Sequence, residues 1–137
     1  MNKKSVLIAS VLSLIVACGD GEDRQQKYLE RAQQFLADEN FDKARIDARN
    51  VLQINPKNSE ARIILGEIGF QEGDIRKAYS MYQSVIDEDP TSVGAYEGIV
   101  KVFIVVKDFE RANDNADKGL EIEPKNVGAF VVFLAEL

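Results

Sequence analysis

Histidine is absent from the 137 residues, and cysteine occurs once, at Cys18. Without histidine the chain has no Ser-His-Asp or Cys-His catalytic group, no histidine metal ligand and no histidine pH switch. A single cysteine can form neither an internal disulfide nor a cysteine zinc site. These absences exclude the commonest catalytic centres, so we expect a protein that is not an enzyme and that uses no cofactor and no metal.

Basic residues are scarce relative to acidic ones, with 17 Lys and Arg against 23 Asp and Glu and a formal net charge of −6. A nucleic-acid-binding surface needs clustered basic residues that displace counterions. The acidic balance therefore argues against a nucleic-acid partner. The hydrophobic fraction of 45% and the charged fraction of 29% are ordinary for one modest globular domain.

An apolar run at residues 6–17 (VLIASVLSLIVA) follows two lysines near the N-terminus. The run is too short for a membrane-spanning helix, which needs about 20 residues, but it suits the core of a signal peptide. It ends in Ile15-Val16-Ala17-Cys18, followed by Gly19, and this ending resembles the bacterial lipobox. The resemblance implies that residues 1–17 are removed and that Cys18 is lipidated, with acyl chains such as palmitate.

The lipoprotein resemblance also implies a location in the bacterial cell envelope, where the chain is lipid-anchored and faces the periplasm. Gly19, rather than aspartate, follows the cysteine, which by resemblance to enterobacterial sorting favours the outer over the inner membrane. Residues 18–24 then form a short linker. The alternative is an ordinary signal peptide that contains a buried, inert cysteine.

The three prolines of the chain, Pro56, Pro90 and Pro124, are spaced by 34 residues. This period is typical of helix–turn–helix solenoids. Each proline follows an apolar helix end and precedes a polar residue that can cap the next helix. With proline at position 32, the repeats span residues 25–58, 59–92 and 93–126, and residues 127–137 contain only the first helix of a fourth.

In the first two repeats, small residues occupy the positions where the paired helices cross, Ala32 with Ala44 and Gly66 with Ala78, whereas the third repeat has Val100 opposite Ala112. Together with the period and the aromatic residues along each helix, they resemble the tetratricopeptide repeat (TPR). The resemblance implies an all-α fold, a right-handed α-solenoid of three repeats plus an orphan first helix. Such a fold closes its core by stacking neighbouring repeats.

Among the turns inside the repeats, only that of the second repeat contains glycine. Gly73 follows the first helix of the second repeat and is free to adopt a positive φ. Glu39 and Lys107 stand at the equivalent places, so we expect those turns to be costlier. Acidic residues lie near the start of each second helix, where a cap or a negative charge is stabilising: Asp42, Asp74 and Asp108.

Asp38, Asn40 and Asp42 together begin like a calcium-binding loop. Such a loop needs glycine at its sixth position and glutamate at its twelfth, where this chain has Lys43 and Arg49. The segment is therefore predicted to be a turn and a helix cap.

In the TPR family the first helices line a concave groove, which the resemblance implies is the partner-binding surface. Its apolar members can hold an extended or helical peptide, and its carboxylates favour basic segments. The alternative for each residue is a contact with a neighbouring helix. The clamp that chaperone-binding members use is absent, so chaperone binding is not implied. The predicted groove residues are Leu29, Glu30, Gln33, Glu60, Ile63, Ile64, Glu67, Phe70, Glu97, Lys101 and Ile104.

Residues 127–137 (VGAFVVFLAEL) are apolar and stop before their partner helix. Solenoids end in polar caps, so we expect this chain to be the N-terminal part of a longer array. The alternative is that the apolar C-terminal helix mediates self-association.

Segments 28–32 (YLERA), 41–45 (FDKAR) and 50–56 (NVLQINP) resemble the start of the TPR lipoproteins that accompany exosortase (PEP-CTERM) and exopolysaccharide export. The resemblance implies a membrane-anchored scaffold for the protein partners of an envelope assembly. Two alternatives remain: a pilotin-like or outer-membrane-assembly lipoprotein, and a fragment whose chemistry lies in a downstream domain.

Overall fold

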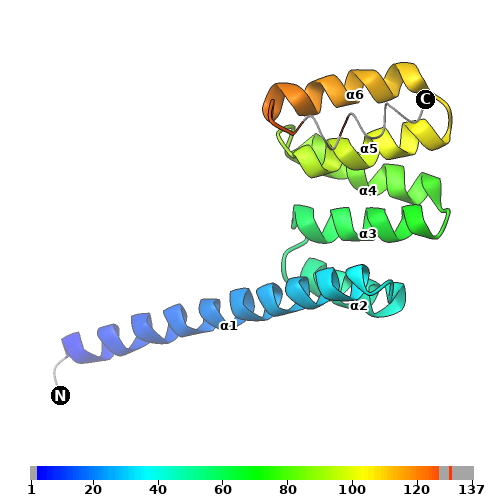
Figure 1. The fold of residues 1–137 in the computed structure, drawn as a ribbon. Helices are drawn as coiled ribbons and strands as arrows, with labels where there is room; N and C mark the ends of the chain where they lie inside the picture. The colour runs from blue at the N-terminus through cyan, green and yellow to red at the C-terminus, as the bar shows by residue number, and fades with distance from the viewer. Residues whose placement is uncertain (1–2, 127–129, 131–137) are drawn as a thin grey trace. The chain divides into compact units, whose positions relative to one another are not determined.

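A computed structural model describes residues 3–126 and residue 130, and for residues 3–19 it describes the backbone alone. The chain divides into two compact units, Met1–Lys57 and Asn58–Leu137. The described residues form six helices and no strand (Figure 1): α1 Lys3–Ala37, α2 Phe41–Ile54, α3 Ser59–Gln71, α4 Ile75–Glu88, α5 Val93–Val105 and α6 Phe109–Ile122.

The helices form antiparallel pairs, which confirms the predicted all-α fold class. Helix α1 contacts α2 in the first unit, and α3 contacts α4 and α5 contacts α6 in the second. Both α3 and α4 also contact α5, so the two pairs of the second unit are stacked (Figure 1). The predicted orphan helix at 127–137 lies outside the described residues, except for Phe130.

Helix α1 is longer than a repeat requires, because it runs without a break through the predicted linker at residues 18–24. In this segment Arg24 Nε donates a hydrogen bond to the backbone oxygen of Asp20 at 3.1 Å. The side chain of Cys18 lies outside the described part, so its lipidation stays a prediction. Over the described residues, no helix has both the length and the apolar character needed to cross a membrane.

The second helix of each pair ends two residues before a proline. The last helical residues and the prolines are Ile54 and Pro56, Glu88 and Pro90, and Ile122 and Pro124. The residues between them, Asn55, Asp89 and Glu123, have φ angles of −132°, −133° and −130°. Because proline keeps the preceding residue out of the helical region, the spacing of the prolines sets the spacing of the helix ends.

The second helices begin at polar caps, whose side-chain oxygens accept a hydrogen bond from the backbone N–H three residues later. The pairs are Asn40 with Lys43, Asp74 with Lys77 and Asp108 with Arg111. Each bond satisfies one of the N–H groups left unpaired at a helix start. The predictions for Asp74 and Asp108 are confirmed. In the first repeat Asn40 is the cap, and Asp42 lies in the first turn, where it pairs with Arg45 at 2.9 Å.

The turns between the paired helices all contain one residue with positive φ. Gly73 has a φ of +79°, and the equivalent residues Glu39 and Lys107 have φ angles of 56° and 60°. The position predicted to favour glycine is therefore confirmed in all three repeats. Two of the repeats place a long side chain in a backbone region that glycine adopts more easily.

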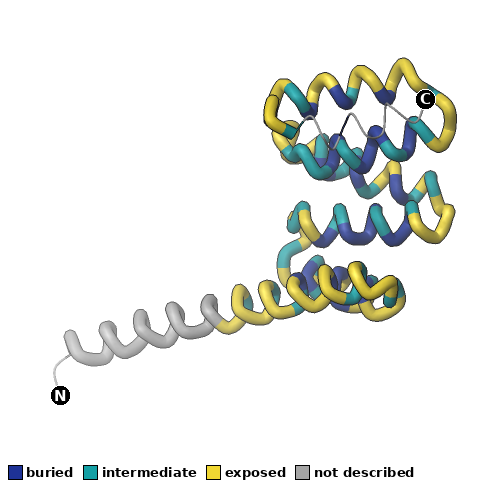
Figure 2. The backbone as a smooth tube through the Cα atoms, in the orientation of Figure 1, coloured by how far each residue is buried: buried dark blue, intermediate teal, exposed yellow. Residues whose placement is uncertain are grey.

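Small residues allow close packing within the pairs α1–α2 and α3–α4. Ala32 and Ala44 are fully buried in the first unit, and Gly66 and Ala78 are buried in the second, as predicted. The core of the second unit has two clusters, one around Tyr82, Ile99 and Phe103 and one around Tyr96, Val100 and Phe130. In Figure 2 the buried residues of α3 and α5 accordingly alternate with half-buried ones along most of each helix.

Candidate functional site

The predicted groove residues of the second unit lie on α3 and α5, the first helices of the second and third repeats. Helix α3 begins after Asn58, whose side chain accepts a hydrogen bond from the Ala61 N–H at 2.8 Å. Spacings of three and four residues place the members on one face of each helix. We call the exposed and half-buried members the α3–α5 face: Glu60, Ile63, Glu67, Phe70, Glu97, Lys101 and Ile104.

The apolar part of the α3–α5 face is formed by Ile63, Phe70 and Ile104. All three are half-buried and pack against the cluster around Tyr82. Their inner surfaces therefore stabilise the core, and their outer surfaces remain available to a partner.

Two other predicted groove residues are in the core. Leu29 and Ile64 are each only 4% exposed, so they offer almost no contact area to a partner. For these two residues the alternative interpretation, a contact with neighbouring helices, describes their place in the structure.

Glu67 is the polar centre of the α3–α5 face. Its Oε2 accepts hydrogen bonds from Lys101 Nζ and from the Tyr82 hydroxyl, both at 3.1 Å, and its Oε1 accepts one from Gln71 Nε2 at 2.8 Å. Burial alone would raise the pKa of Glu67, but these three donors and the charge of Lys101 outweigh it and lower the pKa below its ordinary value. Glu67 is therefore a charged carboxylate that is paired within the protein.

The ring of Tyr82 fills the space between the two helices. A Cβ built on Gly66 would stand 2.7 Å from Cε1 of the ring, and one built on Gly98 would stand 2.5 Å from Cδ1. Both positions therefore need glycine for the ring to fit. Burial raises the pKa of the Tyr82 hydroxyl, and the neighbouring Glu67 carboxylate raises it further, so the group stays protonated as a donor.

The remaining acidic residues of the α3–α5 face are Glu60 and Glu97. Glu60 is exposed in the first turn of α3. Glu97 is half-buried, and its Oε1 accepts a hydrogen bond from Asn126 Nδ2 at 2.7 Å. The α3–α5 face thus has three carboxylates, of which Glu67 is paired with Lys101.

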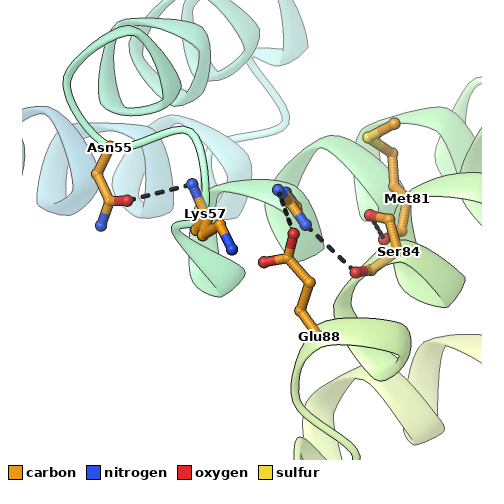
Figure 3. Close-up of polar contacts among 6 residues, drawn as sticks. Asn55, Lys57, Met81, Ser84 and Glu88 are labelled. Carbon is orange, nitrogen blue, oxygen red and sulfur yellow. Dashed lines mark hydrogen bonds and ion pairs between the residues drawn. The ribbon is translucent and has the colours of Figure 1, made fainter.

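Arg62 connects the start of α3 to the end of α4. Its Nη1 donates to the backbone oxygen of Ser84 at 3.2 Å, and its Nη2 lies 3.4 Å from Glu88 Oε1. Figure 3 shows Ser84 and Glu88 at the end of α4, where these contacts are made. The arginine stands at a repeat position that is aromatic in the other two repeats, Tyr28 and Tyr96.

Two other predicted groove residues, Glu30 and Gln33, are exposed on α1 in the first unit. Glu30 Oε1 accepts a hydrogen bond from Gln26 Nε2 at 3.0 Å. The structure thus brings together the predicted groove residues of the second unit. Glu30 and Gln33 form a separate exposed polar strip on α1 of the first unit.

Sequence reasoning missed the charged pair inside the first unit. Asp47 is 1% exposed, and Arg31 Nη2 lies 3.0 Å from its Oδ2. The guanidinium charge of Arg31 balances the charge of the Asp47 carboxylate. The two groups are not aligned as in a hydrogen bond, and Asp47 Oδ2 accepts no hydrogen bond from the described residues. The sequence did contain a signal for the burial of Asp47. This residue lies three or four positions from Ala44 and Val51 and next to Ala48, and so on the buried side of α2.

No protein-family model matches the chain. A segment of 60 residues, 44% of the chain, is 33% identical to the DnaJ homolog subfamily C member 7 homolog of Schizosaccharomyces pombe, and it spans 13% of that protein. Among the residues that the structure describes, no cluster of three or more histidine, cysteine or acidic residues could hold a metal ion.

Solved structures with the same arrangement of helices include the Arabidopsis OM64 TPR domain, with a TM-score of 0.76 and 14% identity. That match covers 85% of this chain and 95% of the domain. A mutant of the Thermobaculum terrenum O-GlcNAc transferase has a TM-score of 0.77 and 22% identity, with 83% of this chain and 22% of the enzyme covered. The MamA protein has a TM-score of 0.65 and 19% identity, with coverage of 79% and 59%. These similarities establish a TPR-like fold.

Proposed function

We propose that this chain is a protein-interaction scaffold that is anchored to the bacterial envelope by lipid and binds segments of partner proteins. The observation that carries the proposal is the α3–α5 face, where half-buried apolar side chains lie beside carboxylates. Partner peptides are commonly held by such a combination of apolar anchors and charged groups. The TPR-like fold supports this use, because stacked repeats offer extended binding surfaces.

The chemistry of the face favours a partner segment with both apolar and basic residues. Ile63, Phe70 and Ile104 provide apolar contact, and Glu60 and Glu97 attract positive charge. Because Glu67 is paired with Lys101, it holds α3 against α5 and contributes less to the attraction of a basic partner segment.

For the location we propose the periplasmic side of the outer membrane, with Cys18 as the lipidated residue. For the pathway we propose an assembly for exopolysaccharide or protein export. The support for both is the resemblance of residues 15–19 to the lipobox and of the first repeat to TPR lipoproteins of such systems.

Charge reversal on the face tests the interaction. Glu60→Lys should weaken the capture of partners from detergent-solubilised envelopes, as measured by quantitative mass spectrometry of a tagged pull-down. Glu110→Lys is the matched control, because Glu110 is an exposed acid in the first turn of α6 and lies outside the face. Both changes remove a favourable charge at a helix start, which is worth about 0.3–1 kcal/mol, and thermal melting shows whether each variant is folded.

A specific loss of captured proteins with Glu60→Lys supports the proposal. Capture that is equal for both variants and the unchanged chain would refute a role for this face in binding. Recovery of export components among the specifically lost proteins would support the pathway, and their absence from that set would count against it.

A further inference from the structure

The first unit contains a shallow pocket that the proposed function does not use. Its volume is about 370 Å³, and it opens between α1 and α2. Its lining residues are Arg31, Phe35, Lys43, Ile46 and Asp47. Ile46 is 59% exposed, an unusual degree of exposure for an isoleucine in the middle of a helix.

In the third repeat, the surface equivalent to this pocket is the one around Phe103. Phe35 and Lys43 occupy the same repeat positions as Phe103 and Arg111, which lie two periods later. In both repeats the cation lies over the ring, with Lys43 Nζ 5.3 Å from the centre of Phe35 and the Arg111 guanidinium 4.5 Å from the centre of Phe103. This geometry is that of a cation–π contact.

In the third repeat a helix completes this arrangement. The ring of Tyr79 on α4 meets the ring of Phe103 edge to face at a centroid distance of 5.9 Å. Ala78 and Tyr82, also on α4, pack with Phe103 in one buried cluster. Phe103 is consequently buried, whereas Phe35 is half-buried and borders a pocket. Among the described residues of the first unit, no helix covers Phe35 as α4 covers Phe103.

The surroundings of Phe35 are more basic than those of Phe103. Arg31 stands at the repeat position of Ile99, which is 1% exposed, and the Arg31 side chain is 50% exposed. Lys43 is also exposed, and the one acidic group of the pocket, Asp47, is buried against Arg31. The lining of this pocket thus carries two cations and one carboxylate, a net positive charge around a single aromatic ring and one exposed isoleucine in a chain whose own net charge is −6.

We propose that this pocket is the docking site for an acidic amphipathic helix of a partner protein. The helix lies on the first unit as α4 lies on α5, with an aromatic side chain against Phe35 and Ile46 and a carboxylate toward Arg31 and Lys43. Charge complementarity and aromatic anchors are the usual means of selecting such a helix. The residues of this site are not part of the α3–α5 face, so experiments can support or refute this proposal independently of the proposed function.

The probe is a helix-stapled, fluorescent peptide of residues 74–88, the chain's own α4, with Tyr82→Glu to place a carboxylate opposite Arg31. It keeps Tyr79 as the aromatic anchor. Two companion peptides carry Tyr82→Lys or, in addition to Tyr82→Glu, Tyr79→Ala. Binding to the full chain in detergent micelles is measured by fluorescence anisotropy.

We expect the Tyr82→Glu peptide to bind about tenfold more tightly than the Tyr82→Lys peptide, and removal of the Tyr79 ring to weaken binding about fivefold. In the protein, Ile46→Asp should weaken binding about fivefold. Ile54→Asp is the matched control, an exposed isoleucine on the same helix and outside the pocket.

Equal binding of the glutamate and lysine peptides would overturn the charge argument and with it the proposal. Equal binding by the Ile46 and Ile54 variants would show that the peptide attaches elsewhere. The absence of saturable binding up to about 1 mM would show that this surface is a solvated end of the array. Circular dichroism of both variants shows whether each protein is folded.

Discussion

At the scale of single residues, Tyr82 connects the core of the second unit to the α3–α5 face. Its ring is fully buried and contacts the backbone at Gly66 and Gly98, and its hydroxyl donates to Glu67. A tyrosine suits this place because its large apolar ring ends in a polar group that needs a partner when buried. The two glycines therefore matter for the space they leave, since both lie within helices.

A methyl group at Gly98 should destabilise the second unit. In Gly98→Ala the new Cβ would stand 2.5 Å from Tyr82 Cδ1, and overpacking of this kind lowers the free energy of unfolding by about 1–3 kcal/mol. Gly94→Ala, on the same helix, meets its nearest atom at 3.5 Å and should leave stability unchanged or raise it by up to about 1 kcal/mol. Urea denaturation followed by circular dichroism measures both, and equal effects would contradict the role given to the ring.

The residues with positive φ should respond to substitution in opposite directions. Glu39→Gly and Lys107→Gly remove a side chain from the left-handed region and should each raise the free energy of unfolding by about 0.5–1 kcal/mol. Gly73→Ala should lower it by about 1 kcal/mol, because nothing crowds a Cβ there and only backbone strain remains. Thermal denaturation of the three variants tests this prediction. A loss of stability in both Glu39→Gly and Lys107→Gly would contradict the argument from backbone strain.

At the scale of helices, the polar contact between Glu67 and Lys101 joins two consecutive repeats. The two residues occupy the same repeat position on α3 and α5, and their side chains are 20% and 27% exposed. Solvent and salt screen an ion pair that is shielded to this degree less than they screen one on an open surface. The contact therefore stabilises the stacking of two helices that are not paired within one repeat.

Glu67→Gln should weaken this stacking only where the carboxylate is charged. The pKa of Glu67 is lowered from its ordinary 4.5, so its stabilising contribution is present above that value and is lost as the pH falls through the lowered pKa. We expect the variant to be about 1–2 kcal/mol less stable at neutral pH and as stable as the unchanged chain in strong acid.

The measurement is urea denaturation at a series of pH values. Glu110→Gln, at an exposed acidic residue of α6, serves as the control and should change stability little at any pH. A difference between the Glu67 variant and the unchanged chain that persists in strong acid would show that packing, and not charge, is responsible.

At the scale of the whole molecule, the chain combines a TPR-like body with an N-terminal segment of different character. Residues 6–17 are apolar, whereas residues 20–34 are mostly charged or polar. Such a boundary at a cysteine is the feature on which the proposed lipid anchor depends. Lipid attachment holds a protein firmly when more than one acyl chain is present.

Cys18→Ser should release the protein from bacterial membranes into the soluble fraction, because the residue that carries the acyl chains is lost. Gly19→Asp is the control, since it keeps the cysteine and should leave the protein in the membrane fraction. Fractionation followed by immunoblotting measures both. Retention of the Cys18→Ser variant in the membrane fraction would refute the lipid anchor.

The helix ends, the turns and the small residues of this protein were predictable from its sequence because they depend on local chemistry. Proline excludes helix from the residue before it, and a positive φ favours glycine wherever the turn recurs. The period of 34 residues then repeats these local rules. Each second helix therefore ends two residues before a proline.

The extension of helix through residues 18–24 and the cap at Asn40 were not predicted. The first proline of the chain is Pro56, so no proline near residues 18–24 marked a start for α1. At the cap, Asn40 and Asp42 both had suitable side chains, and only the conformation of the turn distinguished between them.

The sequence by itself thus determined the fold class, the period and the turns of this protein. Only the tertiary structure decided which groove residues are accessible, with Leu29 and Ile64 in the core and Glu60 exposed. It also decided that Glu67 is balanced by Lys101. The physical reason is that burial and charge pairing depend on side chains from other helices, which the chain brings together only when it folds.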